Sequence, residues 1–116
     1  MKLTLKNSSQ FSWQGLKGWS YDDLEGFDKL SAAYIEIAAG NSHGKTKNTK
    51  NDRLYYIVGG EGKFDISGNI VFVKKTDIII IPKGIVYDFW AEPDMGLNLF
   101  LVHSPAFDQN YEENVA

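Results

Sequence analysis

Few side chains in this sequence could take part in proton transfer or metal binding. His43 and His103 are the two histidines, and the 116 residues include no cysteine. The lack of cysteine excludes disulfides, thiolate zinc sites, iron–sulfur clusters and a cysteine nucleophile. Two histidines are also too few for a catalytic metal held by three imidazoles. Because neither a phosphate loop nor a serine nucleophile elbow is found, acid–base chemistry remains.

Length and charge set further limits. A chain of this size forms one domain around one core, and its net charge of -3 gives no basic excess for nucleic acid. The longest apolar run falls far short of the roughly 20 residues that span a bilayer. We therefore expect a soluble, cytoplasmic protein with a small-molecule ligand and with no nucleic-acid or membrane partner.

Short strands separated by turn residues follow one another along most of the chain. Their spacing of about 8 to 12 residues is typical of a sandwich or barrel. Lys63–Ile66 and Ile70–Val73 are expected to form a hairpin, whereas Gly59–Gly62 is expected to be a turn. No long window shows the apolar period of a helix. The other expected strands are Leu3–Leu5, Ser31–Ile37, Arg53–Val58, Asp77–Ile81, Val86–Trp90 and Leu97–Val102.

Two of these strands have apolar residues on both faces. In Arg53–Val58 and in Ile78–Ile81 the apolar residues do not alternate with polar ones, which is typical of strands that are covered on both sides. A barrel wall has one buried face, so the outer face needs a cover. Either the aromatic N-terminal segment or a second subunit could supply it, and we expect a homodimer.

Two glycine-containing stretches stand at a recognisable separation. The first is Arg53-Leu-Tyr-Tyr-Ile-Val-Gly-Gly-Glu-Gly62, and the second is Thr76-Asp-Ile-Ile-Ile-Ile-Pro-Lys-Gly-Ile-Val-Tyr87. They resemble the two motifs of the cupin superfamily, G-x5-H-x-H-x3,4-E-x6-G and G-x5-P-x-G-x2-H-x3-N. The resemblance implies an all-β fold, a double-stranded β-helix (jelly-roll) barrel with an extended N-terminal segment. It implies one domain, with N-terminal strands at 1–31, the barrel core at 32–105 and a C-terminal tail at 106–116.

The metal ligands of those motifs are replaced in this chain. Arg53 stands at the position of the ligating glutamate, and Tyr87 at that of the second-motif histidine. The two first-motif histidines correspond to His43 and Lys45 if residues are inserted, or fall among 46–49 if none are. Because a guanidinium would repel a divalent cation, the resemblance implies a cupin without metal or other cofactor. Further departures are Thr76 at a glycine position and Ala91 at an asparagine position.

The resemblance also directs Arg53 into the barrel, where an unpaired charge is costly. Its partner is expected to be an internal carboxylate, Glu36, Glu61 or Asp88, or else a carboxylate, phosphate or sugar oxygen of a ligand. Strand alternation places further aromatic side chains on the inward face, where they form either a pocket or a filled core. The predicted ligand-binding residues are Arg53, Tyr55, Tyr87, Phe89, Lys45 and His43.

The two histidines occupy different settings. His43 and Lys45 lie in a polar loop with three lysines, which is either a solvated loop or a basic rim that attracts an anionic ligand. His103 ends the last expected strand, where we expect packing or capping rather than catalysis.

Two functions are compatible with these features. The first is a metal-independent small cupin that binds a small polar or anionic ligand, a sugar derivative or an organic acid, in the barrel mouth. The second is a metal-free carbohydrate isomerase or epimerase that uses His43 or His103 with Tyr87 as its acid–base pair. The sequence leaves open whether the chain is an enzyme. Histidines that reach Tyr87 across a cavity would favour the second function, and histidines on the outside would favour the first.

Overall fold

The computed structural model describes residues 1–13, 15–21 and 27–115, and within them it is a curled antiparallel sheet. The prediction of an all-β fold is confirmed. In this part of the chain, no helix has the length and apolarity needed to cross a bilayer. The elements are η1 (Leu5–Asn7), β1 (Ser9–Trp13), β2 (Leu16–Tyr21), β3 (Ser31–Ile37), β4 (Thr46–Asn48), β5 (Asp52–Ile66), β6 (Asn69–Lys74), β7 (Ile78–Ile81), β8 (Tyr87–Ala91), β9 (Leu97–Ser104), η2 (Gln109–Tyr111) and β10 (Glu112–Asn114).

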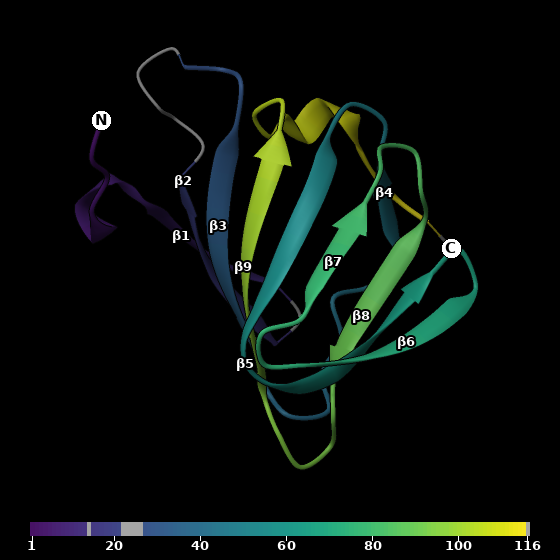
Figure 1. Cartoon of the computed structure of the whole chain (residues 1–116). Coiled ribbons are helices and arrows are strands. Elements are labelled where there is room, and N and C mark those ends of the chain that lie inside the picture. Colours follow the sequence, from purple (N-terminus) through teal and green to yellow (C-terminus); the bar gives the residue numbers. More distant parts are fainter. Residues whose placement is uncertain (14, 22–26, 116) are drawn as a thin grey trace.

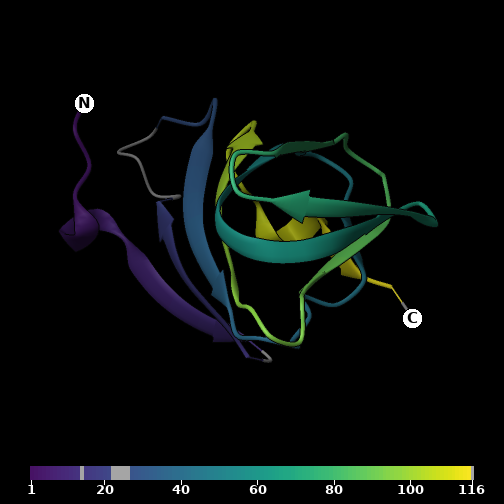
Figure 2. The same cartoon turned by 60° about the horizontal axis from the view of Figure 1, so that its bottom comes forward.

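The strands follow the order β1-β2-β3-β9-β5-β8-β4-β10, and β6 and β7 also pair with β5. Seen obliquely from below, the sheet curls round into a barrel, and β1 and β2 extend it beyond β3 as a wing (Figure 2). The C-terminal segment with η2 lies at the upper end of the barrel (Figure 1). A site inside the barrel is therefore bordered by both ends of the chain.

The long strand β5 forms two parts of the barrel wall. Its first half pairs with β7 and β9, and its second half with β6 and β8. The stretch Gly59–Gly62, which we expected to be a turn, lies within this strand, so that prediction is wrong. The glycines instead allow β5 to bend. The pairing register between β5 and β9 shifts between Ile57 and Gly59. Gly60 has a φ of 78°, and a Cβ on it would overlap the Gly96 carbonyl.

Residues alternate across β5 as its sequence predicted. Arg53, Tyr55 and Ile57 are buried, whereas Tyr56 and Val58 are exposed. Strand β8 behaves in the same way. The hairpin formed by β5 and β6 is also confirmed, with Ile66 opposite Asn69.

The N-terminal part of the chain differs from what we expected. Residues Leu3–Leu5 form no strand; instead a 3-10 turn begins at Leu5, and the Asn7 side chain accepts the Thr4 amide proton at 2.7 Å. N-terminal strands were expected within residues 1–31, but the positions of β1 and β2 were not predicted, and β2 pairs edge to edge with β3. The hairpin of β1 and β2 therefore leaves the outer face of β7 uncovered, with Ile78 and Ile80 each 55% exposed.

Thr76 precedes β7 and adopts a backbone conformation that suits glycine. Its φ is 79°, and its amide donates to the Ile57 carbonyl at 2.8 Å. For a β-branched residue the left-handed region costs roughly 1–2 kcal/mol. Thr76 at the position of the motif glycine therefore has an unfavourable backbone conformation, and its hydrogen bond to Ile57 helps to hold it.

Candidate functional site

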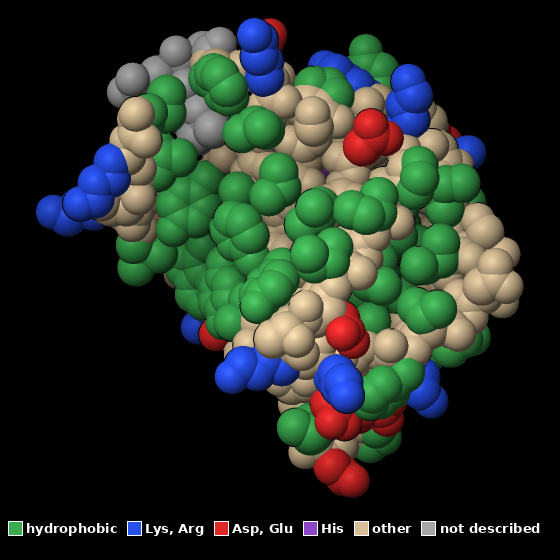
Figure 3. All heavy atoms as spheres, viewed as in Figure 1, with side chains coloured by type: hydrophobic (Ala, Val, Ile, Leu, Met, Phe, Trp, Pro, Cys, Tyr) green, Lys and Arg blue, Asp and Glu red, His purple; other side chains and the backbone are tan. Residues whose placement is uncertain are grey.

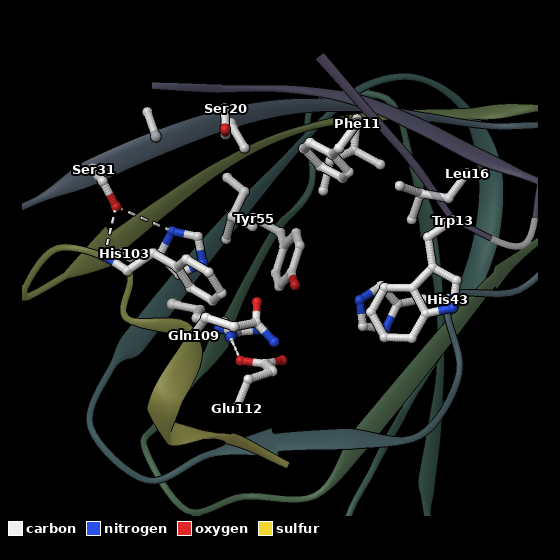
Figure 4. Close-up of a pocket in the computed structure, with 16 residues that line it drawn as sticks. Phe11, Trp13, Leu16, Ser20, Ser31, His43, Tyr55, His103, Gln109 and Glu112 are labelled. Carbon is white, nitrogen blue, oxygen red and sulfur yellow. Dashed lines mark hydrogen bonds and ion pairs between the residues drawn. The ribbon is translucent and has the colours of Figure 1, made fainter. Parts of the chain in front are cut away.

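A cavity of about 320 Å³ lies inside the curled sheet, and both apolar and polar side chains line it, with His43 beside Trp13 (Figure 4). Its position between the N-terminal hairpin and the C-terminal segment follows from the fold. The apolar side chains of the cavity include Phe11, Trp13, Leu16, Ala33, Ile35 and Leu101, and the polar groups are His43, Arg53, Tyr55, His103, Gln109 and Glu112, with Ser20 and Ser31 at its margin.

The N-terminal hairpin supplies two aromatic side chains, Phe11 and Trp13, that we had not placed in the site. Phe11 lies opposite Gly18 on β2, and a Cβ at Gly18 would strike the Phe11 ring. Glycine thus leaves room for the ring to lie across β2. The Trp13 ring lies 5.7 Å from that of His43. The alternation of Phe11 and Trp13 with small polar residues was the signal in the sequence that could have located them.

Arg53 is at the centre of the buried polar cluster, and it is 4% exposed. Its guanidinium donates to the Tyr87 hydroxyl and to the Glu112 carboxylate, while the Tyr55 and Tyr87 hydroxyl oxygens lie 2.5 Å apart. Burial raises the pKa of both tyrosines, so both stay protonated at neutral pH. The Tyr55 hydroxyl is thereby positioned on the cavity wall as a hydrogen-bonding group.

The positions at which the cupin motifs hold a metal carry other chemistry here. On β4, Thr46 and Asn48 are buried and Lys47 lies between them, which corresponds to the motif alignment without an insertion. Thr46 pairs with Tyr87, and Asn48 donates to Glu112 at 2.9 Å. This set lacks the imidazoles of the cupin motifs, and the Arg53 guanidinium would repel a divalent cation. Among residues 1–13, 15–21 and 27–115, no three His, Cys, Asp or Glu side chains cluster as metal ligands.

His43 is a neutral imidazole on the cavity wall. Its Nδ1 lies 2.9 Å from the Gly44 carbonyl oxygen, which places the ring proton on Nδ1 and leaves Nε2 as an acceptor. The ring stacks on Phe89 at 4.7 Å and on Tyr87 at 6.0 Å. Burial lowers the pKa of His43. His43 therefore presents a neutral imidazole with a free acceptor nitrogen beside Tyr87.

His103 lines the cavity across from His43 and is 6% exposed. Its Nδ1 is 3.4 Å from the Ser31 hydroxyl, which itself accepts the Phe107 amide proton at 2.8 Å. Burial, with a smaller effect of the Arg53 charge, lowers the pKa of His103 to about 3. His103 is thus a neutral imidazole on the cavity wall.

The structure brings together some of the predicted site residues and separates others. His43, Arg53, Tyr55 and His103 line the cavity. Tyr87 bonds to Tyr55 from behind, and Phe89 supports the His43 ring. Lys45 lies in a different hollow, beside Asp65 and Asp88.

The expected internal ion pair of Arg53 is confirmed, but the carboxylates named for it were wrong. The ion-pair partner is Glu112, rather than Glu36, Glu61 or Asp88, because β10 folds back and pairs with β4. The pairing of β10 with β4 joins segments that are far apart in the sequence, and no local sequence pattern predicts it. The loop lysines are also not a simple rim, since Lys50 pairs with Asp108 at 3.5 Å.

Comparison with known proteins identifies the family. The family model of the AraC-like ligand-binding domain matches residues 35–111, which is more than half of the 116 residues. The chain belongs to the AraC-like ligand-binding domain family. This family has a cupin-type fold, so the resemblance to cupins is confirmed. The chain is thus a cupin-like ligand-binding domain.

Solved structures share the fold of this AraC-like domain. Pac13 from Streptomyces, described as a nucleoside dehydratase, has a TM-score of 0.85 and 22% identity, over 99% of this chain and 90% of Pac13. A Trp-to-Phe variant of oxalate decarboxylase from B. subtilis has a TM-score of 0.87 and 16% identity, over 97% of this chain and 32% of that protein. These likenesses confirm the jelly-roll barrel.

One curated protein also matches in sequence. Plasmepsin VII of Plasmodium falciparum is 24% identical over 115 residues, which is 97% of this chain. The chain spans 25% of the length of plasmepsin VII.

The ion pair predicts the effect of removing Arg53. Arg53→Met leaves the Glu112 carboxylate, whose side chain is 9% exposed, without its partner, and should lower the free energy of unfolding by about 3 to 5 kcal/mol. Adding Glu112→Leu should restore most of the loss, because an apolar pair replaces a buried ion pair at little cost. Urea unfolding of both variants checks this. A deficit equally large in the double variant would contradict it.

His103 predicts a pH dependence of stability. Its folded-state pKa of about 3 lies below the ordinary value of 6.5, so only the unfolded chain takes up a proton there as the pH falls below 6.5. Stability is therefore lost towards acid pH, by roughly 2 kcal/mol between pH 6.5 and 5. Urea unfolding at several pH values should show this loss in the wild type. In His103→Gln the free energy of unfolding should depend less steeply on pH. Equal slopes in the two proteins would show that His103 is protonated in the folded state.

Proposed function

We propose that this chain is a metal-independent cupin that binds a neutral, sugar-containing ligand in its cavity. The observation that carries the proposal is that Arg53 is already paired with Glu112. The charge of Arg53 is therefore already balanced within the chain. This disfavours an organic acid, which was one of the ligands compatible with the sequence. The Tyr55, His43 and His103 polar groups share the cavity with apolar side chains, as in sites where few polar atoms orient a ligand.

Pac13 supports a nucleoside as the type of sugar-containing ligand. Its solved structures include a His-to-Gln variant and two Tyr-to-Phe variants, each with uridine. This chain has His43, His103 and Tyr55 on its cavity wall, and the Tyr87 hydroxyl contacts that of Tyr55 from behind. Aromatic rings at Trp13 and Phe11 offer stacking surfaces for a planar base.

Catalysis is the second candidate function, and the position of the histidines favours it. Both histidines line the cavity instead of lying outside the barrel, and the His43 ring stacks on Tyr87. Nε2 of His43 would accept a proton from a carbon next to a carbonyl group. A tyrosine hydroxyl would donate one to the departing or recipient oxygen. Such a pair would serve an isomerase or epimerase, or a dehydratase as Pac13 is described.

Uridine binding tests the proposed ligand class. Isothermal titration should give saturable binding that survives treatment with a metal chelator. Tyr55→Phe should weaken binding roughly 5- to 10-fold through the loss of one hydrogen bond, whereas Tyr56→Phe, on the exposed face, should not. Retained binding in Tyr55→Phe, or loss after chelation, would contradict the proposal. Turnover of uridine-derived aldehydes or ketones that His43→Gln abolishes would establish catalysis.

A homodimer is the second part of the proposal, and it rests on the outer apolar face. Tyr56 pairs with both Ile78 and Phe100, and Leu54 pairs with both Ile80 and Val102, so these side chains form two adjacent rows. The face consists of Leu54, Tyr56, Ile78, Ile80, Phe100 and Val102. Hydrophobic side chains gather over β3, β9, β5 and β7 in the space-filling view (Figure 3). A face of this kind marks an interaction site, and a second copy would cover it symmetrically. The cytoplasmic location stays a prediction.

Sedimentation velocity tests the dimer. The wild type should sediment at twice 13.1 kDa, and Ile78→Lys with Ile80→Lys should sediment as a monomer, because two charges would be buried in the interface. Ile70→Lys on β6 is the matched control: Ile70 is 54% exposed but lies outside the face, so this variant should remain dimeric. A wild type that is monomeric at micromolar concentration would overturn this part of the proposal.

A further inference from the structure

The carboxylate inside the cavity is supplied by the last described strand. Glu112 begins β10, and its side chain lines the cavity, where Figure 4 shows it below Tyr55 and Gln109. Its Oε2 accepts from Arg53 and, at 2.9 Å, from Asn48. The next residue, Glu113, is exposed and takes part in β10 only through pairing with Lys47. One of two adjacent glutamates is thus built into the site.

Glu112 makes the cavity electrically neutral. Among the described residues that line it, Arg53 and Glu112 are the two with a full charge at neutral pH, because burial lowers the pKa of both His43 and His103. The charges of Arg53 and Glu112 cancel. Without Glu112 the same cavity would hold one uncompensated guanidinium, which is the group best suited to bind a carboxylate or phosphate.

An anionic ligand that approached the Arg53 guanidinium would find the Glu112 carboxylate already bound there. It would have to displace a carboxylate that two side chains already hold, or else lie beside it as a like charge with little water to screen the repulsion. A neutral polyol meets neither obstacle, because hydrogen bonds to Tyr55 or the histidines leave the ion pair intact. The position of Glu112 therefore distinguishes ligands by charge.

We infer that Glu112 determines specificity, in that it occupies the anion-binding face of Arg53 and so restricts the cavity to neutral ligands. The inference rests on the proposed function in taking this cavity as the ligand site. Removal of the carboxylate converts the cavity into an anion site.

Chemical rescue with formate tests the inference without reference to any natural ligand. Glu112→Ala leaves both a space and an unpaired Arg53, so sodium formate should raise its Tm by several degrees more than sodium chloride does. Formate should bind this variant roughly ten-fold or more tightly than the wild type. Glu113→Ala is the matched control and should respond to formate as the wild type does. An equal response of wild type and Glu112→Ala to formate overturns the inference.

A second variant and a second pair of probes cover the other outcomes. Glu112→Gln keeps the size and the Asn48 contact, which guards against failure of Glu112→Ala to fold. The ratio of affinities for uridine and uridine 5′-monophosphate should favour uridine in the wild type and fall roughly ten-fold in Glu112→Gln, but not in Glu113→Gln. An unchanged ratio counts against the inference. If the wild type binds neither uridine nor uridine 5′-monophosphate, the proposed ligand class fails. The formate comparison alone then decides the role of Glu112.

Discussion

The ion pair between Arg53 and Glu112 is the interaction on which the rest of the site depends. It joins the long strand β5 to the final strand β10, and thereby fixes the C-terminal segment at one side of the cavity. It also sets the electrostatics, because a guanidinium at this depth is tolerated only with its charge compensated. Tyr87 completes the arrangement by accepting from the same guanidinium and contacting the Tyr55 hydroxyl. The Arg53 guanidinium thus holds the C-terminal segment against the barrel, contacts Tyr87 and balances the charge of Glu112.

The same cluster shows how a cupin barrel can keep its architecture after its metal positions have changed. A metal draws several strands together through its ligands, and here hydrogen bonds take over that role. Asn48 from β4 and Arg53 from β5 both donate to Glu112, and Tyr87 from β8 accepts from Arg53. At these positions the chain has neutral donors and one ion pair where the cupin motifs have imidazoles and a carboxylate. The cavity beside them is lined by groups that can orient a ligand.

The sequence predicted the inward face of the barrel better than it predicted the residues that close it. The resemblance to cupins placed Arg53 inward, and period-two alternation then placed Tyr55 inward and Tyr56 outward, because successive side chains of a strand point to opposite faces. Glu112 could not be found in this way: its strand has three residues and pairs only with β4, so its place depends on tertiary structure. The Gly59–Gly62 stretch shows a third case, since glycines mark a change of direction without saying whether the chain turns or the strand bends.

The cavity wall runs from Phe11 near one end of the chain to Glu112 near the other. A wall of this kind cannot form locally, because its first and last strands lie at opposite ends of the strand order and face the same cavity only after the intervening sheet has curled. Antiparallel barrels with such distant pairings fold slowly, and the entropy of closing the chain opposes early contacts between its ends. The binding site should therefore appear together with the global fold rather than as a preformed local unit. A ligand seated there would hold both ends of the sheet, and its binding energy would protect the whole domain against unfolding.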